Sequence, residues 1–302
     1  MNRWHVLLVG GMNRTEFRPI KPSLCSVAIV EEAEDLRKGC RLLEKGDFLP
    51  DLLLLLQSYP REFSAEQLDA FRRLAPLASV GVVLGPWCEG EGRSGKPLPG
   101  TWRMYWHQWS GRWGRQWERW FQRECPLWGW PTTAIEEDYL LAAPVPPAQS
   151  RSDRIGLWSL QPQSADWLFT ALKDWGFDPQ WIRFDAGQQA SNILGTEPRN
   201  FHRSKSGKMP LPEEVFRRQD SSQLSKLNAV VFDGTDAEGM EAVWLRQLAT
   251  RMPESNILLL VDFPRPELWE RVRPWGVKAI LGKPIALGDL VWHLDQLENK
   301  ET

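Results

Sequence analysis

The sequence predicts an α/β protein with two doubly wound, five-stranded parallel-sheet domains in tandem. Short strand-like apolar runs alternate with segments of helical periodicity along the chain. The run at residues 52–56 is apolar on both faces, as in a parallel sheet that helices cover on each side. The order of elements in the first half recurs in the second, and 302 residues suffice for two domains of ordinary size.

In the first half, four predicted strands precede a loop rich in glycine and proline, and a fifth follows it. The predicted strands are residues 6–9, 27–30, 52–56, 80–84 and 103–107. The loop at residues 85–100 takes the place of the fourth helix.

Three helices are predicted between and after these strands, at residues 31–43, 64–74 and 110–125. Tryptophans recur at a spacing of four and three from Trp102 onward. A single long helix from Thr101 is therefore an alternative to a strand followed by a helix.

Composition divides the chain into three parts. Residues 1–125 predict the first domain, and residues 126–152 predict a proline-rich linker with a short helix from Thr133. Residues 153–302 predict the second domain, which carries a polar insertion at about residues 186–222.

The second domain repeats the alternation of strands and helices. Its predicted strands are residues 155–160, 181–184, 229–232, 256–261 and 277–281. Its predicted helices are residues 164–175, 238–251, 265–273 and 286–297. Five strands that alternate with helices are typical of a doubly wound sheet of the flavodoxin-like type.

Charge and hydropathy argue against two classes of partner. The net charge is -2, so no global positive charge recruits nucleic acid or an anionic membrane. No apolar segment approaches the ~20 residues that a membrane span requires, and the N-terminus lacks a signal-peptide pattern. We therefore expect a cytoplasmic protein that binds neither nucleic acid nor membrane.

The cysteines predict no metal site and no disulfide framework. The four residues, Cys25, Cys40, Cys88 and Cys125, are widely separated, and none belongs to a C-x-x-C pair. We expect free thiols, and the sequence indicates no cofactor.

Three features of the second half carry a resemblance to a known family. A central strand ends in an aspartate at Val230-Val-Phe-Asp233, a late strand leads to Lys283-Pro284, and an amphipathic helix follows Ile285. Residues 154–296, apart from the insertion, thus resemble the receiver domain of response regulators. The resemblance implies that Asp233 stands at the phosphoacceptor position and that Lys283 contacts the phosphoryl group.

The second half departs from the family pattern at two places. The family holds a divalent cation with an acidic pair after the first strand, where this chain has Trp158-Ser159-Leu160-Gln161. The family also has Ser or Thr after the fourth strand, where this chain has Asp262, which we expect to add repulsion. The resemblance therefore implies a pseudo-receiver with a degenerate phosphoacceptor site, Asp233, Lys283 and Asp262.

The first half departs further from the family. Its central strand ends at Gln57, which cannot form an acyl phosphate, and Gly10-Gly11 stand where acids are needed. The resemblance there rests on the order of elements alone.

Two sequence motifs resemble those of enzymes but are incomplete. Residues 90–96 match most of a P-loop, but Pro97 replaces the Ser or Thr that binds magnesium, so a loop is favoured. Residues 232–236 resemble the start of a haloacid dehalogenase, but Thr235 replaces the second acid. A nucleophilic thiol formed by Cys88 with His107 is a further hypothesis.

Tryptophan is unusually abundant, with 18 residues, and eight of them lie between Trp102 and Trp130. The stripe predicts either a core-facing last helix or a surface for a partner, because Trp and Arg are frequent at interface hot spots. The candidate surface residues are Trp113, Trp117, Trp120 and Arg119, with Trp87 and Cys88 from the glycine-rich loop.

The sequence thus favours a non-catalytic signalling or protein-interaction module that binds a protein partner or forms a homodimer, and not an enzyme. One alternative is a phosphorelay receiver that accepts phosphate on Asp233. Another is an unrecognised enzyme or anion binder that uses the 85–100 loop with Cys88 and His107.

Overall fold

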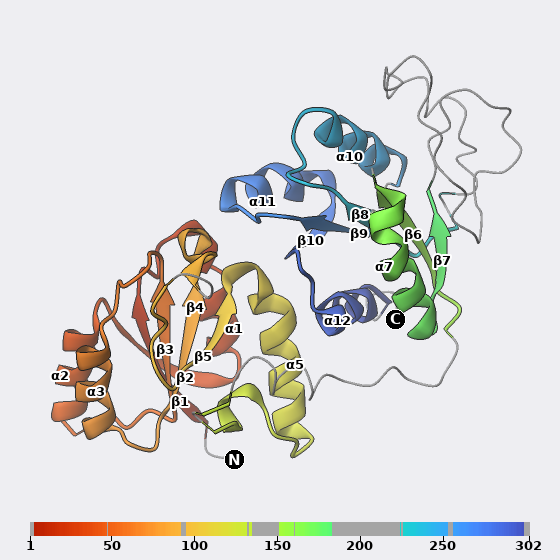
Figure 1. The fold of residues 1–302 in the computed structure, drawn as a ribbon. Helices are drawn as coiled ribbons and strands as arrows, with labels where there is room; N and C mark the ends of the chain where they lie inside the picture. The colour runs from red at the N-terminus through yellow and green to blue at the C-terminus, as the bar shows by residue number, and fades with distance from the viewer. Residues whose placement is uncertain are drawn as a thin grey trace, which may run out of the picture. The chain divides into compact units, whose positions relative to one another are not determined.

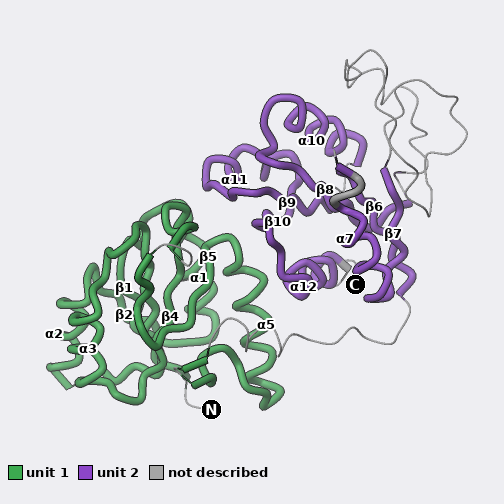
Figure 2. Tube along the Cα trace, in the orientation of Figure 1, with its two compact units in different colours: residues 1–143 green, residues 144–302 purple. Residues whose placement is uncertain are grey.

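The structure is a computed structural model that divides into two compact units, residues 1–143 and residues 144–302 (Figure 2). It describes residues 3–46, 48–91, 95–131, 133–134, 151–159, 161–182, 224, 226–252 and 256–298. The predicted insertion at 186–222 and residues 135–150 of the predicted linker lie outside these ranges.

A five-stranded parallel sheet forms the centre of the first unit (Figure 1). Its strands are β1 (Trp4–Gly10), β2 (Ala28–Ala33), β3 (Leu52–Gln57), β4 (Ser79–Leu84) and β5 (Trp102–Tyr105). Their order is β2-β1-β3-β4-β5, the order of flavodoxin-like doubly wound sheets. All five leucines of β3 are fully buried, which the run of apolar residues on both faces predicts.

Helices cover both faces of this sheet. One apolar core contains residues of α1 (Ile20–Cys25) and α5 (Trp109–Phe121). The other contains residues of α2 (Leu36–Glu44) and α3 (Ala65–Leu74). The 3-10 turn η4 (Leu127–Gly129) places Trp128 in the core with α5, so the first unit continues beyond residue 125.

The second unit has the same architecture. Its strands are β6 (Arg154–Ser159), β7 (Asp178–Trp181), β8 (Ala229–Asp233), β9 (Ile257–Val261) and β10 (Val277–Gly282). Their order is β7-β6-β8-β9-β10, and every pairing is parallel. The prediction of two doubly wound five-stranded sheets in tandem is therefore confirmed.

Among the described residues, helices flank the second sheet on both faces (Figure 1). One face packs against α7 (Pro162–Asp174) and α12 (Leu287–Glu298). The opposite face packs against α10 (Gly239–Arg251) and α11 (Pro266–Val272). Among the residues that the structure describes, no helix has both the length and the apolar character needed to cross a membrane.

Several predicted boundaries are wrong. Strand β2 continues to Ala33, and α2 starts only at Leu36, because the Asp35 side chain caps it by accepting from the backbone N–H of Lys38 at 2.7 Å. The short helix α1 was not expected. The helix predicted at residues 164–175 begins two residues earlier, at Pro162.

The alternative of one long helix from Thr101 is wrong, because β5 pairs with β4 over Trp102 to Tyr105. The Trp102 ring lies over Gly81, where an added Cβ would come within 2.1 Å of the ring. A 3-10 turn, η3 (Trp106–Gln108), then leads into α5, so His107 is not part of the strand.

Candidate functional site

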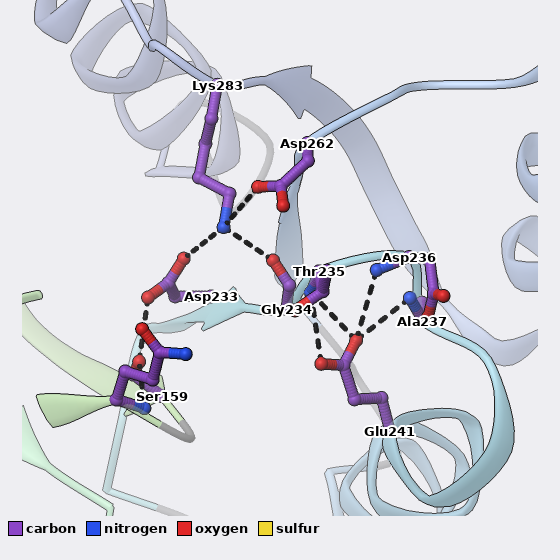
Figure 3. A network of polar contacts seen from close by, with 10 residues as sticks. Ser159, Asp233, Gly234, Thr235, Asp236, Ala237, Glu241, Asp262 and Lys283 are labelled. Atoms are coloured by element: carbon purple, nitrogen blue, oxygen red, sulfur yellow. Dashed lines mark hydrogen bonds and ion pairs between the residues drawn. The ribbon is translucent and has the colours of Figure 1, made fainter. Parts of the chain in front are cut away.

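The candidate site lies at the carboxyl end of the second sheet, where ligands bind in doubly wound folds. Asp233 is the last residue of the central strand β8, and Ser159 is the last residue of β6. The two residues face each other in the strand register. Lys283 follows β10, and Asp262 follows β9 (Figure 3). Four strand ends thus bring these side chains together.

Each oxygen of the Asp233 carboxylate accepts a hydrogen bond from within the chain (Figure 3). The Ser159 hydroxyl donates to Oδ2 at 2.7 Å, and Lys283 Nζ donates to Oδ1 at 3.1 Å. Lys283 Nζ also contacts Asp262 Oδ1 at 2.9 Å and the carbonyl oxygen of Gly234 at 2.7 Å. Because an ammonium has three donors, these contacts match the full donor capacity of Lys283.

The cluster is partly shielded from water. The exposed fraction of the side chain is 14% for Asp233, 31% for Lys283 and 43% for Asp262. Burial alone would lower the pKa of Lys283, but the hydrogen bond to Asp262 and the charge of Asp233 outweigh it and raise the pKa above 10.5. Lys283 is therefore a firmly charged ammonium.

The repulsion expected from Asp262 is offset by a cation that lies next to it. The Lys283 ammonium lies between Asp262 and Asp233 and contacts both carboxylates. Attraction across these two contacts offsets the repulsion between the two carboxylates.

The side chains of the cluster do not fit a divalent cation. Magnesium is held by carboxylate and other oxygen ligands, but only Asp233 and Asp262 supply carboxylates here, and both contact Lys283. Within the described ranges, no three His, Cys, Asp or Glu side chains form a group that could hold a metal ion.

A fifth side chain organises the loop after β8. Glu241, in the first turn of α10, is 7% exposed and accepts from three consecutive backbone N–H groups. The distances to its Oε2 are 2.8 Å from Thr235, 3.3 Å from Asp236 and 2.9 Å from Ala237. Successive backbone N–H groups that converge in this way form an anion-binding nest, which this chain fills with its own carboxylate.

The corresponding strand end in the first unit carries a neutral amide. Gln57 ends β3, and its Nε2 donates to Glu91 Oε1 at 2.9 Å and to Cys88 Sγ at 3.6 Å. All three residues are at most 5% exposed. This buried polar group occupies the place that Asp233 has in the second unit.

The structure does not bring Cys88 and His107 together as a nucleophile and base. Burial raises the pKa of the Cys88 thiol to about 11, against the opposing hydrogen bond from Gln57. Burial, followed by the charge of Arg112, lowers the pKa of His107 to about 3. Among the described residues, no hydrogen bond joins the two side chains, and the thiol instead donates to the Gln57 carbonyl at 3.5 Å.

The P-loop-like segment is only partly described, because residues 92–94 lie outside the described ranges. The two residues that border this gap are joined, because the backbone N–H of Gly95 donates to the Glu91 carbonyl at 2.9 Å. The Glu91 side chain points into the buried contact with Gln57.

The tryptophan stripe divides between core and surface. Trp113 is 4% exposed and Cys88 is fully buried, so neither can contact a partner, contrary to that hypothesis. Trp117 packs against the core that contains Trp113, and it contacts Trp4 edge to face. Trp120 is 43% exposed and Trp87 is 73% exposed.

Arg119, the remaining predicted surface residue, lies beside Trp120 near the end of α5. Its side chain is 32% exposed and pairs with Glu124 at 3.2 Å. The next aromatic residue, Phe121, is 59% exposed.

Sequence reasoning missed two residues of the cluster, Ser159 and Glu241. Ser159 was noticed only as the absence of an acid, although its place at the end of β6 opposite Asp233 follows from parallel pairing. Glu241 had one signal, an acid in the first turn of a predicted helix.

No protein-family model and no curated protein matches this chain. Among solved structures, a D-isomer specific 2-hydroxyacid dehydrogenase from Lactobacillus delbrueckii ssp. bulgaricus, with NAD, has 7% identity and a TM-score of 0.25; the match covers 91% of this chain and 77% of that one. A phosphoglycerate oxidoreductase from Vibrio cholerae O395 has 10% identity and a TM-score of 0.22, with coverages of 94% and 86%.

A 3-phosphoglycerate dehydrogenase from Entamoeba histolytica, with bound NAD⁺, has 7% identity and a TM-score of 0.21. That match covers 99% of this chain and 94% of the other. TM-scores this low carry no conclusion about the function of this chain.

Proposed function

We propose that the chain is a non-catalytic signalling or protein-interaction module, built from two receiver-like domains without phosphoacceptor chemistry. One observation carries the absence of phosphoacceptor chemistry in this proposal. Both oxygens of the Asp233 carboxylate are held by donors of the chain itself, Ser159 and Lys283.

Phosphoryl transfer to a carboxylate requires a free attacking oxygen and a cation that neutralises the phosphate charge. For Asp233 to attack, one oxygen would have to leave Ser159 or Lys283. Ser159 also stands where a receiver would supply an acidic cation ligand, and a neutral hydroxyl cannot replace that charge. The site therefore favours a closed, unmodified state of Asp233.

The interaction half of the proposal rests on exposed aromatic side chains of the first unit. Trp120 and Phe121 are 43% and 59% exposed at the end of α5, beside Arg119. Trp87 is 73% exposed after β4. Large exposed aromatic side chains next to arginine are frequent at interface hot spots. These side chains fit a protein partner or a second copy of this chain. The proposal places this interaction in the cytoplasm.

Incubation with radiolabelled acetyl phosphate and magnesium tests the closed site. Wild type should take up no hydroxylamine-labile label, while a functional receiver protein included in the same experiment should become labelled. Label on wild type that the Asp233→Asn variant loses would support the rival function, a phosphorelay receiver, and would overturn the proposal.

A further inference from the structure

The loop between β8 and α10 is held from two sides. Glu241 of α10 accepts from the backbone N–H groups of Thr235, Asp236 and Ala237. From α11, Arg271 donates to the carbonyl oxygen of Ala237 at 3.1 Å. Ala237 has a φ of 51°, in the left-handed region, and contacts at both its N–H and its C=O hold it there. The loop conformation is thus fixed by one side chain from α10 and one from α11.

One peptide group of this loop connects Glu241 to the Asp233 cluster. The N–H of Thr235 donates to both oxygens of Glu241, at 3.0 and 2.8 Å. The C=O of the same peptide group, that of Gly234, accepts from Lys283 Nζ at 2.7 Å. In a trans peptide, N–H and C=O point in opposite directions within one plane. Fixing the N–H on Glu241 therefore aims the carbonyl at Lys283 (Figure 3).

Glycine at position 234 is what allows this approach. A Cβ added there would lie 2.8 Å from Glu241 Oε2 and 3.2 Å from the Phe232 ring. Only a residue without a side chain leaves the carboxylate in its present place. The need for glycine is an observation independent of the hydrogen bonds, and it points to the same contact.

We propose that Glu241 is a positioning residue that holds Lys283 in its ion pairs with Asp233 and Asp262, acting through the Gly234–Thr235 peptide group. The inference rests on the proposed function, because it explains what keeps the Asp233 site closed. The carboxylate, the peptide and the ammonium form a line of contacts that polarise one another. Loss of the carboxylate frees the peptide to rotate and removes one of the three acceptors of Lys283.

The experiment measures how fast Lys283 reacts with trace acetic anhydride, with mass spectrometry of each lysine in the folded full-length chain. An ammonium with three acceptors is a poor nucleophile, because only the free amine reacts. In Glu241→Ala, we expect Lys283 acetylation to accelerate about tenfold, which corresponds to roughly 1.4 kcal/mol and is at the scale of one hydrogen bond to a charged group. Lys278, an exposed residue on β10, the strand that Lys283 follows, should keep its wild-type rate.

Three variants separate positioning from a merely structural role. Glu241→Gln keeps an oxygen that can accept from the same N–H groups and should restore a Lys283 rate within about threefold of wild type. Gly234→Ala should push the carboxylate away and accelerate Lys283 even if Glu241→Ala does not fold. Glu238→Ala is the matched control, because Glu238 lies in the same loop, is 61% exposed and pairs with Arg271.

An unchanged Lys283 rate in a folded Glu241→Ala or Gly234→Ala variant would overturn the positioning role. Acceleration of Lys278 together with Lys283 would also count against it, since that result indicates general loosening. The acetylation rates need neither phosphate nor metal. The positioning role can therefore fail while Asp233 proves unreactive, and Asp233 can prove reactive while the positioning role stands.

Discussion

Replacing Lys283 with methionine removes the ammonium but keeps a side chain of similar length. Among the described residues, the change removes the cation that contacts Asp262 and leaves Asp233 with the Ser159 hydroxyl as its side-chain donor. Removing one partner of a fully buried ion pair costs about 3–5 kcal/mol, and an exposed pair contributes about 0.2–1 kcal/mol. Exposed fractions of 14%, 31% and 43% place this cluster between the two limits. We expect the free energy of unfolding of the second unit to fall by about 2 kcal/mol.

Differential scanning calorimetry of the full chain measures this change. A loss of about 2 kcal/mol corresponds to a midpoint shift of roughly 4–8 °C for a unit of this size. Lys278→Met is the matched control, because Lys278 is exposed on β10, the strand that Lys283 follows, and it should change the stability by less than about 0.5 kcal/mol. Equal stabilities of the two variants would refute the conclusion that Lys283 holds the site closed.

Folding raises the pKa of Lys283 above 10.5, so the contribution of Lys283 to stability is complete below pH 10.5 and is lost as the pH rises through the folded pKa. The difference in unfolding free energy between wild type and Lys283→Met should therefore stay constant from neutral pH to about pH 10 and shrink above it. A decline of this difference below about pH 9 would contradict the prediction. The pKa of Cys88 is about 11, against 9.0 for an ordinary cysteine, so Cys88 should have about 100-fold less thiolate, and iodoacetamide should modify the exposed Cys25 and Cys125 first. Modification of Cys88 at the rate of Cys25 and Cys125 would revive the nucleophile hypothesis. Trp113→Ala should lower the free energy of thermal unfolding by about 3–5 kcal/mol, because Trp113 is buried, whereas Trp120→Ala should lower it by about 1 kcal/mol or less and weaken association measured by sedimentation. The reverse order would show that the assignment of Trp113 to the core and Trp120 to the surface is wrong.

The sheets could be predicted from the sequence because their central strands are apolar on both faces, as at residues 52–56. The end of β2 could not be predicted, because Glu31 and Glu32 interrupt the apolar pattern. They continue the strand because β2 lies at the sheet edge and pairs with β1, which leaves both side chains exposed. The six-residue α1 was missed because it is short and contains Pro22.

For the site, the resemblance supplied Asp233 and Lys283, but their surroundings depend on contacts between distant segments. Ser159 reaches Asp233 only through the register of β6 and β8. The net effect of Asp262 could not be predicted, because it depends on where the Lys283 ammonium lies as well as on the number of acids nearby. Glu241 acts by folding back onto backbone groups, which the identities of the loop residues do not reveal.

Titration with beryllofluoride and magnesium, followed by tryptophan fluorescence, tests the closed state of Asp233 most directly. Trp158 is a reporter next to the site, because it precedes Ser159 and its buried ring stacks on Phe232, the neighbour of Asp233, with ring centroids 3.9 Å apart. We predict no saturable change at millimolar metal, in wild type or in Asp233→Ala. A saturable change in wild type that Asp233→Ala abolishes would contradict the closed site and establish a functional receiver.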